Sequence, residues 1–307
     1  MTVLDPHFIL NATLQKLEGA YAASTLRIYR DDFRRFSIYC ARHGFSDLPS
    51  TPEAVVGFIQ DLADQAATPG GIRRILYSLS NLHRLSHFED PIQDAEVRIA
   101  IRQMHRRLGR SARQASGIRE QDLQAMSKAC PETLRGFRNR VLIRVGYDAL
   151  CRVGELVSIN AEHVALPKIW LPRSKTDPDG RGDWLHLSRE GGRLLSEWLI
   201  TTGITEGPVF TGLDASGKPR QRLRQSEVIR VLKHLARQAG IHPEGISGHS
   251  LRVGAAQDLL LKGASLQAIM ERGRWAKTET VMRYLENAPS EHSKALKRDP
   301  DFDLFPR

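Results

Sequence analysis

Long hydrophobic runs are missing from this sequence: no stretch reaches the ~18 consecutive apolar residues that a membrane-spanning helix needs. No basic stretch precedes the apolar residues near the N-terminus, so a secretory signal is not expected. Cysteine is scarce, and Cys40, Cys130 and Cys151 are odd in number and far apart. That pattern argues against a disulfide scaffold and favours a reducing compartment. These absences exclude membrane and secreted classes, and we expect a cytoplasmic protein.

Basic residues outnumber acidic residues in this chain. Its 307 residues include 45 Lys and Arg against 35 Asp and Glu, which gives a formal net charge of +10. With 41% hydrophobic residues the chain can bury a core and is too apolar to be disordered. The length is typical of about two domains. The positive charge indicates a polyanionic partner, either a nucleic acid or an acidic protein.

The first third of the sequence has the apolar spacing of α-helices and no strand-like alternation. Behind Ser24, a candidate N-cap, apolar residues recur at spacings of three and four: Leu26, Tyr29, Phe33, Phe36 and Cys40. Thr51 is expected to cap a second helix that has Pro52 at its first position. A third helix should follow a Pro-Gly-Gly break, and a fourth should run from Pro91 to about Leu108. The sequence therefore predicts an all-helical domain over residues 1–108.

A strongly basic segment closes this region. Between residues 95 and 115 six arginines accompany a single acidic residue, and they are Arg98, Arg102, Arg106, Arg107, Arg110 and Arg113. The first three are four residues apart and therefore lie on one stripe of a helix. A solvated helix face is the ordinary explanation, and the net charge makes a stripe that follows phosphates an equal alternative. We expect a basic linker over residues 109–117.

Residues 118–307 have the pattern of a mixed, mostly helical domain. Helical periodicity recurs in Arg119–Cys130, Leu134–Leu150, Gly191–Thr201, Gln225–Ala239, Ser250–Lys262, Leu266–Arg272 and Thr278–Leu285. Two short strands, Lys168–Leu171 and Asp183–Leu187, flank a polar loop and predict a β-hairpin. The predicted fold class is mainly α, with an all-helical N-terminal domain and a mostly helical second domain that contains a small sheet.

Several motifs that would indicate a cofactor are incomplete or missing. Gly212–Lys218 spells most of a phosphate-binding P-loop, but Pro219 follows where that motif needs a hydroxyl residue for magnesium. The histidines form no HExxH motif, the cysteines form no CxxC motif, and no carboxylate cluster suits a two-metal nuclease. We therefore expect neither a cofactor nor a metal.

Four local patterns remain: Cys151-Arg-Val-Gly-Glu155, Ser174-Lys175-Thr176, Gly248-His249-Ser-Leu-Arg252-Val-Gly254, and Gly273-Arg-Trp275 followed by Tyr284. Taken alone, each has an ordinary explanation as a surface ion pair, a solvated loop lysine, a helix cap or packing residues. Because His249 and Arg252 are three residues apart at a helix start, they can face the same way.

Taken together and in this order, the patterns resemble the catalytic set of the tyrosine recombinase (phage integrase) family, which runs Arg, Lys, His-x-x-Arg, His or Trp, Tyr. The match is tightest to Cre-type members, through the segment from His249 to Ala256, Trp275 and its spacing to Tyr284. The helical N-terminal region and basic linker are also similar to the family's core-binding domain. The resemblance implies a site-specific recombinase that cleaves and rejoins duplex DNA through a 3′-phosphotyrosyl intermediate, without metal or ATP.

The resemblance also implies a role for each matched residue. Tyr284 would be the nucleophile, while Arg152 and Arg252 would bind the phosphate oxygens with planar, charged donor groups. Lys175 would protonate the departing 5′-hydroxyl.

Three further side chains would assist. His249 would hydrogen-bond the phosphate and help to move the tyrosine proton. Trp275 would supply packing and an indole hydrogen bond in place of the histidine found in many relatives. Glu155 would orient its neighbours from behind.

Contacts to DNA are assigned to basic and amide side chains on both domains. The candidates are Arg27, Arg30, Arg34, Arg73, Arg74, Arg98, Arg102, Arg106, Arg107, Arg220, Arg222, Arg224 and Gln225. The partner implied by the resemblance is double-stranded DNA with inverted-repeat recombination sites, and DNA binding would place the protein at the nucleoid.

The end of the chain carries apolar residues within a charged segment: Phe302, Leu304 and Phe305, after a short helical stretch at Ser290–Leu296. They could dock on their own domain. The resemblance favours insertion into a neighbouring protomer, with a dimer on each site and a tetramer in the synapse.

Two alternatives stay open at the level of the sequence. A type IB topoisomerase or hairpin telomere resolvase would use related chemistry without exchanging partners, although such enzymes tend to carry extra domains. A catalytically silent DNA-binding protein of the same fold is a second alternative, and the complete catalytic set argues against it.

Overall fold

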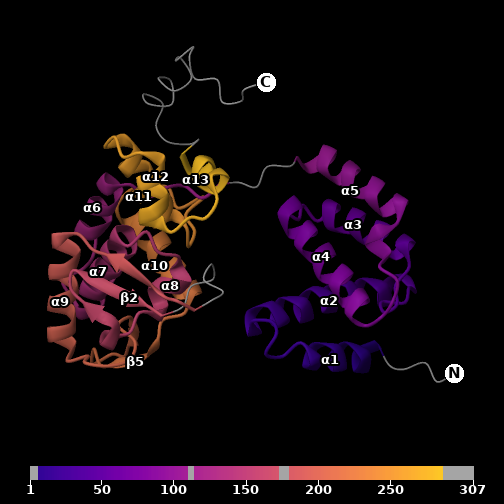
Figure 1. The fold of residues 1–307 in the computed structure, drawn as a ribbon, viewed down its shortest axis with the longest axis horizontal. Helices are drawn as coiled ribbons and strands as arrows, with labels where there is room; N and C mark the ends of the chain where they lie inside the picture. Colours follow the sequence, from indigo (N-terminus) through magenta and orange to yellow (C-terminus); the bar gives the residue numbers. More distant parts are fainter. Residues whose placement is uncertain (1–5, 110–113, 173–179, 286–307) are drawn as a thin grey trace, which may run out of the picture. The chain divides into compact units, whose positions relative to one another are not determined.

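The computed structural model describes residues 6–109, 114–172 and 180–285, and the chain divides after Arg113 into two compact units (Figure 1). Each unit has its own cluster of buried apolar side chains. The division falls within the segment expected to be a linker. Among the described residues, no helix is long and apolar enough to cross a membrane.

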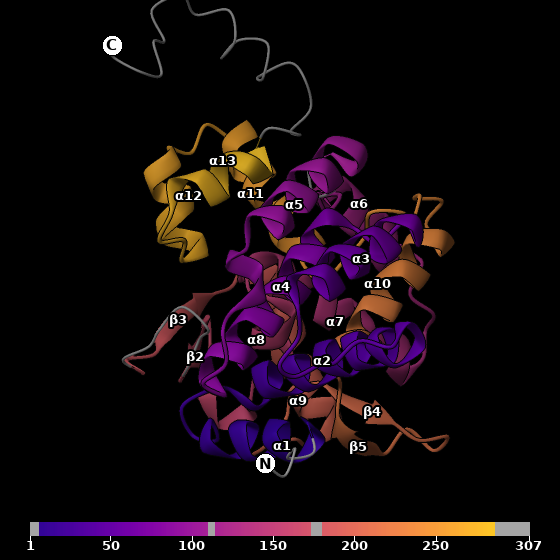
Figure 2. The same cartoon turned by 90° about the vertical axis from the view of Figure 1, so that its right-hand side faces the viewer.

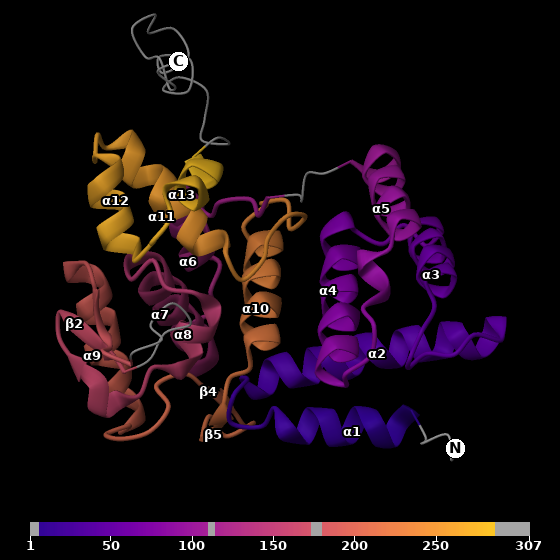
Figure 3. The same cartoon turned by 45° about the vertical axis from the view of Figure 1, so that its right-hand side comes forward.

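The first unit is a bundle of helices. Its elements are α1 (Pro6–Lys16), α2 (Ala23–His43), α3 (Pro52–Asp64), α4 (Pro69–Leu85), the 3₁₀ turn η1 (Pro91–Gln93) and α5 (Ala95–Leu108). Helix α4 packs on α2, and α3 packs on α5 (Figure 3). Phe33, Phe36 and Phe58 are fully buried between them, and the ring centroids of Phe36 and Phe58 are 5.1 Å apart.

Three helices of this unit, α3, α4 and α5, begin with a side-chain cap, although not always at the predicted residue. Thr51 caps α3 as predicted, because its hydroxyl accepts a hydrogen bond from the Ala54 N–H at 3.3 Å. The prediction that Ser24 caps α2 is wrong, since the helix already begins at Ala23. Helix α1 was not predicted.

Two prolines act differently from the prediction. The Pro-Gly-Gly segment was expected to break the chain before the third helix, but Pro69 begins α4, because proline fits the first turn of a helix and Thr68 caps it. The fourth predicted helix does not begin at Pro91, which opens a separate 3₁₀ turn. Asp94 then accepts the Glu96 N–H at 2.8 Å and starts α5.

Helix α5 has one apolar and one basic face, as the arginine spacing predicts. Its apolar face buries Val97, Ala100 and Met104. The side chains of Arg98, Arg102 and Arg106 are exposed on the other side. The stripe is therefore available to a partner of negative charge.

The second unit is mostly helical and carries two small antiparallel sheets. Its elements are α6 (Glu120–Lys128), α7 (Leu134–Asp148), α8 (Val153–Ser158), η2 (Ala161–His163), β1 (Val164–Ala165), β2 (Lys168–Leu171), β3 (Asp183–His186), α9 (Arg189–Thr202), β4 (Thr211–Leu213), β5 (Pro219–Arg222), α10 (Gln225–Gln238), α11 (Ser250–Leu261), α12 (Leu266–Gly273) and α13 (Thr278–Leu285). The seven helices predicted for this region are confirmed to within a few residues. The fold class is therefore confirmed.

The predicted β-hairpin is confirmed, and a second hairpin was missed. Strands β2 and β3 pair antiparallel with Ile169 opposite Leu185, and β1 adds to the edge of β2. Strands β4 and β5 form the other sheet, away from the first (Figure 2). The segment that resembled a P-loop is the turn between them, where Asp214 accepts hydrogen bonds from the backbone N–H groups of Ser216 and Lys218. The backbone N–H groups that a phosphate would need are therefore bonded to this carboxylate.

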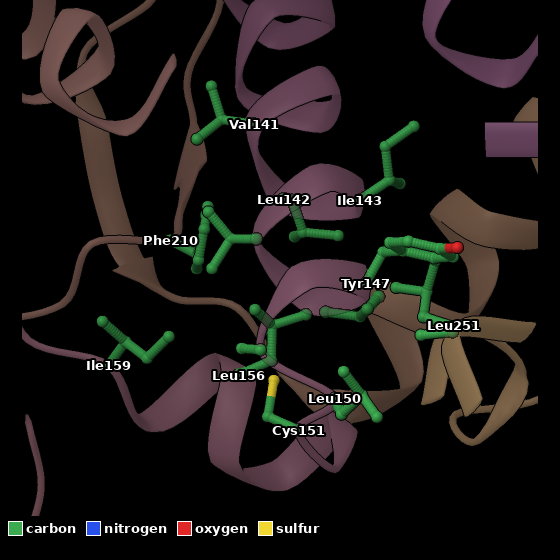
Figure 4. Close-up of a cluster of buried hydrophobic side chains, with 14 of the residues drawn as sticks. Val141, Leu142, Ile143, Tyr147, Leu150, Cys151, Leu156, Ile159, Phe210 and Leu251 are labelled. Atoms are coloured by element: carbon green, nitrogen blue, oxygen red, sulfur yellow. The ribbon is translucent and has the colours of Figure 1, made fainter. Parts of the chain in front are cut away.

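Helix α7 is the centre of the second unit. Val141, Leu142 and Ile143 are fully buried although they are consecutive, so the helix is covered on all sides. Figure 4 shows Leu150, Cys151 and Leu156 packed at its C-terminal end, where the chain turns into α8. The residue that follows Cys151 is therefore held by a rigid core.

Helix α11 approaches a neighbouring backbone so closely that only glycine fits. Ile118 donates its N–H to the Ser250 carbonyl at 2.9 Å. A Cβ atom added at Gly254 would lie 1.8 Å from the Ile118 carbonyl oxygen. Packing thus explains the glycine two residues after Arg252, because it lets α11 lie directly against the backbone at Ile118.

Gly254→Ala is expected to destabilise the protein by about 3 kcal/mol, since the backbone has to move to remove the overlap. The same substitution at Gly70, where nothing lies within 4 Å of the added Cβ, is the matched control and should be neutral or slightly stabilising. Urea denaturation of both variants measures the difference. Equal stability of the two variants would contradict the close approach.

Candidate functional site

Four segments far apart in the sequence meet in the second unit. They are the turn from α7 into α8, the start of α11, the turn after α12, and helix α13. Helices α11, α12 and α13 lie together at one end of the unit (Figure 1), and α11 also packs on α7. The expected site residues that the structure describes are brought together here, and they are Arg152, Glu155, His249, Arg252, Trp275 and Tyr284.

Arg152 and Glu155 form the first part of the site. Arg152 precedes α8, and the carboxylate of Glu155 closes the first turn by accepting the Arg152 backbone N–H at 2.9 Å. The same carboxylate accepts Nη1 of Arg152 at 2.7 Å. Burial alone would raise the pKa of Glu155, but the guanidinium of Arg274 and the bonds from Arg152 hold it below the usual range. Glu155 is therefore ionised and fixes Arg152.

Arg252 is the most deeply buried cation of the site, with 1% of its surface exposed. It donates hydrogen bonds to the carbonyl oxygens of Leu150 and Gly273, the latter at 2.5 Å. Its guanidinium carbon lies 4.1 Å from the ring centroid of Trp275, in a cation–π contact. These contacts leave three of the five N–H groups of the side chain for another acceptor.

The charge of Arg252 is not neutralised by a bonded carboxylate. Burial and the neighbouring cations, Arg152 first among them, lower its pKa to about 10, so it stays protonated at neutral pH. Within the part of the chain that the structure describes, no carboxylate lies within ion-pair distance of this guanidinium. A buried cation without such a partner is costly. The arrangement is that of an anion site.

His249 lies at the start of α11, next to the two arginines. Loss of hydration and the positive charges of Arg252 and Arg152 lower its pKa below the ordinary value. The imidazole is therefore neutral at neutral pH, and one ring nitrogen can accept a proton. Its side chain is exposed, so a ligand can reach it.

Tyr284 faces the arginines from α13. Its ring packs edge-on against Trp275 with a centroid separation of 5.9 Å, and the side chain is half-buried. Gln257 of α11 donates to the Tyr284 backbone carbonyl at 3.0 Å and holds α13 in place. The phenol is close enough to Arg252 to raise the pKa of that guanidinium slightly, against the larger effect of burial. The thiol of Cys151, which directly precedes Arg152, has its pKa raised to about 12 by burial and is unreactive.

One predicted site residue and one predicted segment cannot be placed. Lys175 lies outside the described residues, as does the chain end from Ser290 to Phe305. Sequence reasoning also missed a residue of the site. Arg274 donates to Glu155 at 2.7 Å and is 90% buried, and its position beside Trp275 in a short turn was the only available signal.

Most candidate DNA contacts are exposed, and several already have partners within their own unit. The exposed side chains are Arg27, Arg30, Arg34, Arg73, Arg74, Arg98, Arg102, Arg106, Arg107, Arg220, Arg224 and Gln225. Arg222 differs because it is half-buried and donates to the Val157 carbonyl and the Asn160 amide oxygen, both at 2.6 Å. Arg74 and Arg107 pair with Asp32 and Asp64. Arg222 therefore has a structural task in joining β5 to α8.

Metal ligands do not gather at the site. Across residues 6–109, 114–172 and 180–285, no three His, Cys, Asp or Glu side chains lie where they could share an ion. The side chains that do gather there include the guanidinium groups of Arg152 and Arg252, a neutral imidazole and the Tyr284 ring.

Comparison with known proteins also points to the phage integrase family. The phage integrase family model matches residues 117–291. The integrase/recombinase XerD homolog of Selenomonas ruminantium is 30% identical, over 92% of this chain and 87% of that protein. The recombinase Cre of Escherichia phage P1 is 23% identical, over 92% of this chain and 90% of its own length.

Solved structures share the fold. A lambda integrase tetramer bound to a Holliday junction aligns with a TM-score of 0.65 at 17% identity, over 91% of this chain and 76% of that chain. The XerH site-specific recombinase, in a post-cleavage complex with a palindromic difH substrate, aligns with a TM-score of 0.64 at 15% identity, over 94% and 83% of the two chains.

Proposed function

Because the chain belongs to the phage integrase family, the tyrosine recombinases, we propose that it is a site-specific DNA recombinase that cleaves and rejoins DNA. One observation carries the assignment of the site: Arg252 is a buried cation with free donors and lies beside Arg152, His249 and the Tyr284 ring. A phosphodiester supplies the missing negative charge. The two planar guanidinium groups fit its non-bridging oxygens.

The reaction is a phosphoryl transfer with Tyr284 as the nucleophile. The phenol oxygen forms a bond to the scissile phosphorus, and the bond from phosphorus to the 5′-oxygen breaks. The DNA 3′ end is then held as a phosphotyrosyl ester. Attack by a 5′-hydroxyl on that ester reverses the step and rejoins the strand, so that no external energy source is consumed.

Protons and charge are handled by the remaining residues. His249 takes the tyrosine proton or shares it with the phosphate. It can do so because its lowered pKa leaves the imidazole neutral at neutral pH. Lys175 donates a proton to the departing 5′-oxygen. Arg152 and Arg252 stabilise the charge that the phosphate oxygens carry in the transition state. Trp275 packs against Arg252, and Glu155 orients Arg152.

The partner is double-stranded DNA with inverted-repeat sites, and the working form is an oligomer. We propose a dimer on each site and a tetramer in the synapse, in line with the tetrameric lambda integrase on a Holliday junction. The apolar chain end would insert into a neighbouring protomer. Residues 1–108 would serve as the core-binding domain, 109–117 as the linker and 118–307 as the catalytic domain.

The test is covalent capture on a nicked suicide duplex that carries closely spaced inverted repeats from beside the encoding gene. We expect a protein–DNA adduct on a denaturing gel, formed with a chelator present and no ATP. Binding without an adduct would indicate a silent DNA-binding protein. Relaxation of a supercoiled plasmid that lacks the repeats would indicate a topoisomerase instead.

Arg102→Ala tests whether the α5 stripe follows phosphates. We expect weaker binding by a similar factor on all DNA sequences, because the substitution removes one exposed cation and does not remove a contact to a base. The slope of log Kd against log salt should fall by about 0.9, the value for one phosphate contact. Arg193→Ala, which removes an exposed arginine paired with Glu197 on α9, is the control and should leave the slope unchanged. A loss confined to the cognate sequence would mean that Arg102 reads bases.

A further inference from the structure

Arg274 occupies a backbone conformation that arginine rarely adopts. Its φ and ψ are 58° and 49°, in the left-handed region that favours glycine. The residue nevertheless has its side chain 90% buried, with the guanidinium inside the site. A strained position that carries a buried cation points to a task for the side chain.

The first contact of Arg274 is to Glu155. Nη2 of Arg274 lies 2.7 Å from Oε2 of Glu155, and the same oxygen accepts the Arg152 backbone N–H at 2.9 Å. Oε1 accepts Nη1 of Arg152 at 2.7 Å. The buried carboxylate is thus held between two arginines, one of which is expected to bind the phosphate.

The second contact of Arg274 is to the β2–β3 hairpin. Its Nε is buried and, among the described residues, makes no hydrogen bond. It lies 3.7 Å from Oδ2 of Asp183, the first residue of β3. Asp183 also accepts the Trp184 N–H through its other oxygen, at 2.7 Å. Arg274 therefore reaches from the end of α12 to both α8 and β3, the strand that follows Lys175 in the sequence.

The neighbours of Arg274 hold the other site arginine. The Gly273 carbonyl accepts a hydrogen bond from Arg252 at 2.5 Å, and the Trp275 ring covers the Arg252 guanidinium. A Cβ atom at Gly273 would lie 1.8 Å from the Trp275 ring, so the turn is tightly closed. One three-residue turn thus fixes Arg152 through Glu155 and Arg252 directly.

We propose that Arg274 is a positioning residue for DNA cleavage: it locks Glu155 so that Arg152 presents its guanidinium to the scissile phosphate. Arg274 acts through Glu155 and touches no reacting atom. The proposal rests on the recombinase function proposed above, and it adds a residue to which the catalytic set Arg, Lys, His-x-x-Arg, His or Trp, Tyr assigns no role.

Arg274→Gly separates this task from folding. Glycine removes the left-handed strain, which offsets part of the loss of the Arg274–Glu155 ion pair, so the melting temperature should fall only slightly and the rates are compared below it. In single-turnover capture at saturating DNA, the rate of adduct formation should fall at least about tenfold, because Arg152 is no longer fixed. The Kd for DNA should change by less than about twofold, since many other contacts determine it. Ala66→Gly, an exposed left-handed residue in the first unit, is the control and should keep the full rate.

A conservative variant and a pH profile exclude a purely structural role. Arg274→Lys should recover part of the lost rate, because the ammonium can still pair with Glu155. In Arg274→Gly the pKa of Glu155 should rise. Burial still opposes ionisation of the carboxyl, and the positive charge that favours ionisation then comes from Arg152, which is bonded to it, and from Arg252 nearby. Cys151, another titratable group close to Glu155, does not ionise near neutral pH. The ratio of wild-type to variant rate should therefore be larger at pH 6 than at pH 8.

The outcomes distinguish the two levels of proposal. Absence of any adduct with the wild-type protein would overturn the proposed function itself. A wild-type adduct combined with an Arg274→Gly rate within twofold of wild type, and the same pH profile, would overturn the positioning role alone. A fall in rate that Arg274→Lys does not reverse, together with a large fall in the melting temperature, would likewise reject it.

Discussion

Tyr284→Phe is expected to abolish covalent attachment to DNA while leaving the fold and the binding intact. The substitution removes only the phenol oxygen. The ring keeps its edge-on packing on Trp275, and the bond from Gln257 to the backbone carbonyl is unaffected. Adduct formation on the suicide duplex should fall by at least about 10⁴-fold, which is typical of the loss of a nucleophile. Denaturing gels measure the adduct, and gel shifts measure the binding.

The control for this prediction is a tyrosine of the other unit. Tyr77 lies on α4 with 64% of its surface exposed, so Tyr77→Phe removes a tyrosine hydroxyl from the unit that does not carry the site. That variant should form the adduct at the wild-type rate. If Tyr284→Phe still formed an adduct, the attacking oxygen would have to come from a different residue, and the anion site would need to be reinterpreted.

Much of this fold could be predicted because local signals and packing agree. The spacing of Leu26, Phe33 and Phe36 predicts α2, and those side chains are the ones that the unit buries. The predicted hairpin was found because short β-rich runs flank a polar loop. In the site, His249 and Arg252 could be paired from their spacing alone, since a helix places residues three apart on one face.

What the sequence could not predict depends on contacts between distant segments. Strands β4 and β5 are short and polar, and the closing turn around Asp214 resembles a broken nucleotide motif. Arg274 has no local pattern, because its importance comes from a carboxylate 119 positions away. Gly254 is similar, since the reason for glycine is the carbonyl of Ile118. The roles of these residues depend on contacts that exist only in the folded chain.

Arg252→Lys is expected to lower the rate of adduct formation by about 10³-fold even at saturating DNA. Lysine keeps one positive charge but loses the planar group that bonds the Leu150 and Gly273 carbonyls and stacks on Trp275. The phosphate then loses a fixed cation in the transition state, which in phosphoryl transfer is worth at least this much. Single-turnover rates below the melting temperature of the variant measure the effect.

The control is a second buried arginine with similar bonds. Arg138 is 5% exposed and donates to the Thr211 carbonyl and the Asn139 amide oxygen. Arg138→Lys should lose a comparable amount of stability, about 1–3 kcal/mol for each unsatisfied acceptor, and should keep its cleavage rate while folded. If both variants lost activity in proportion to stability, Arg252 would be a structural cation. A selective loss at Arg252 would show that its unpaired charge is reserved for the phosphate, because both arginines are buried and each donates to two oxygen acceptors.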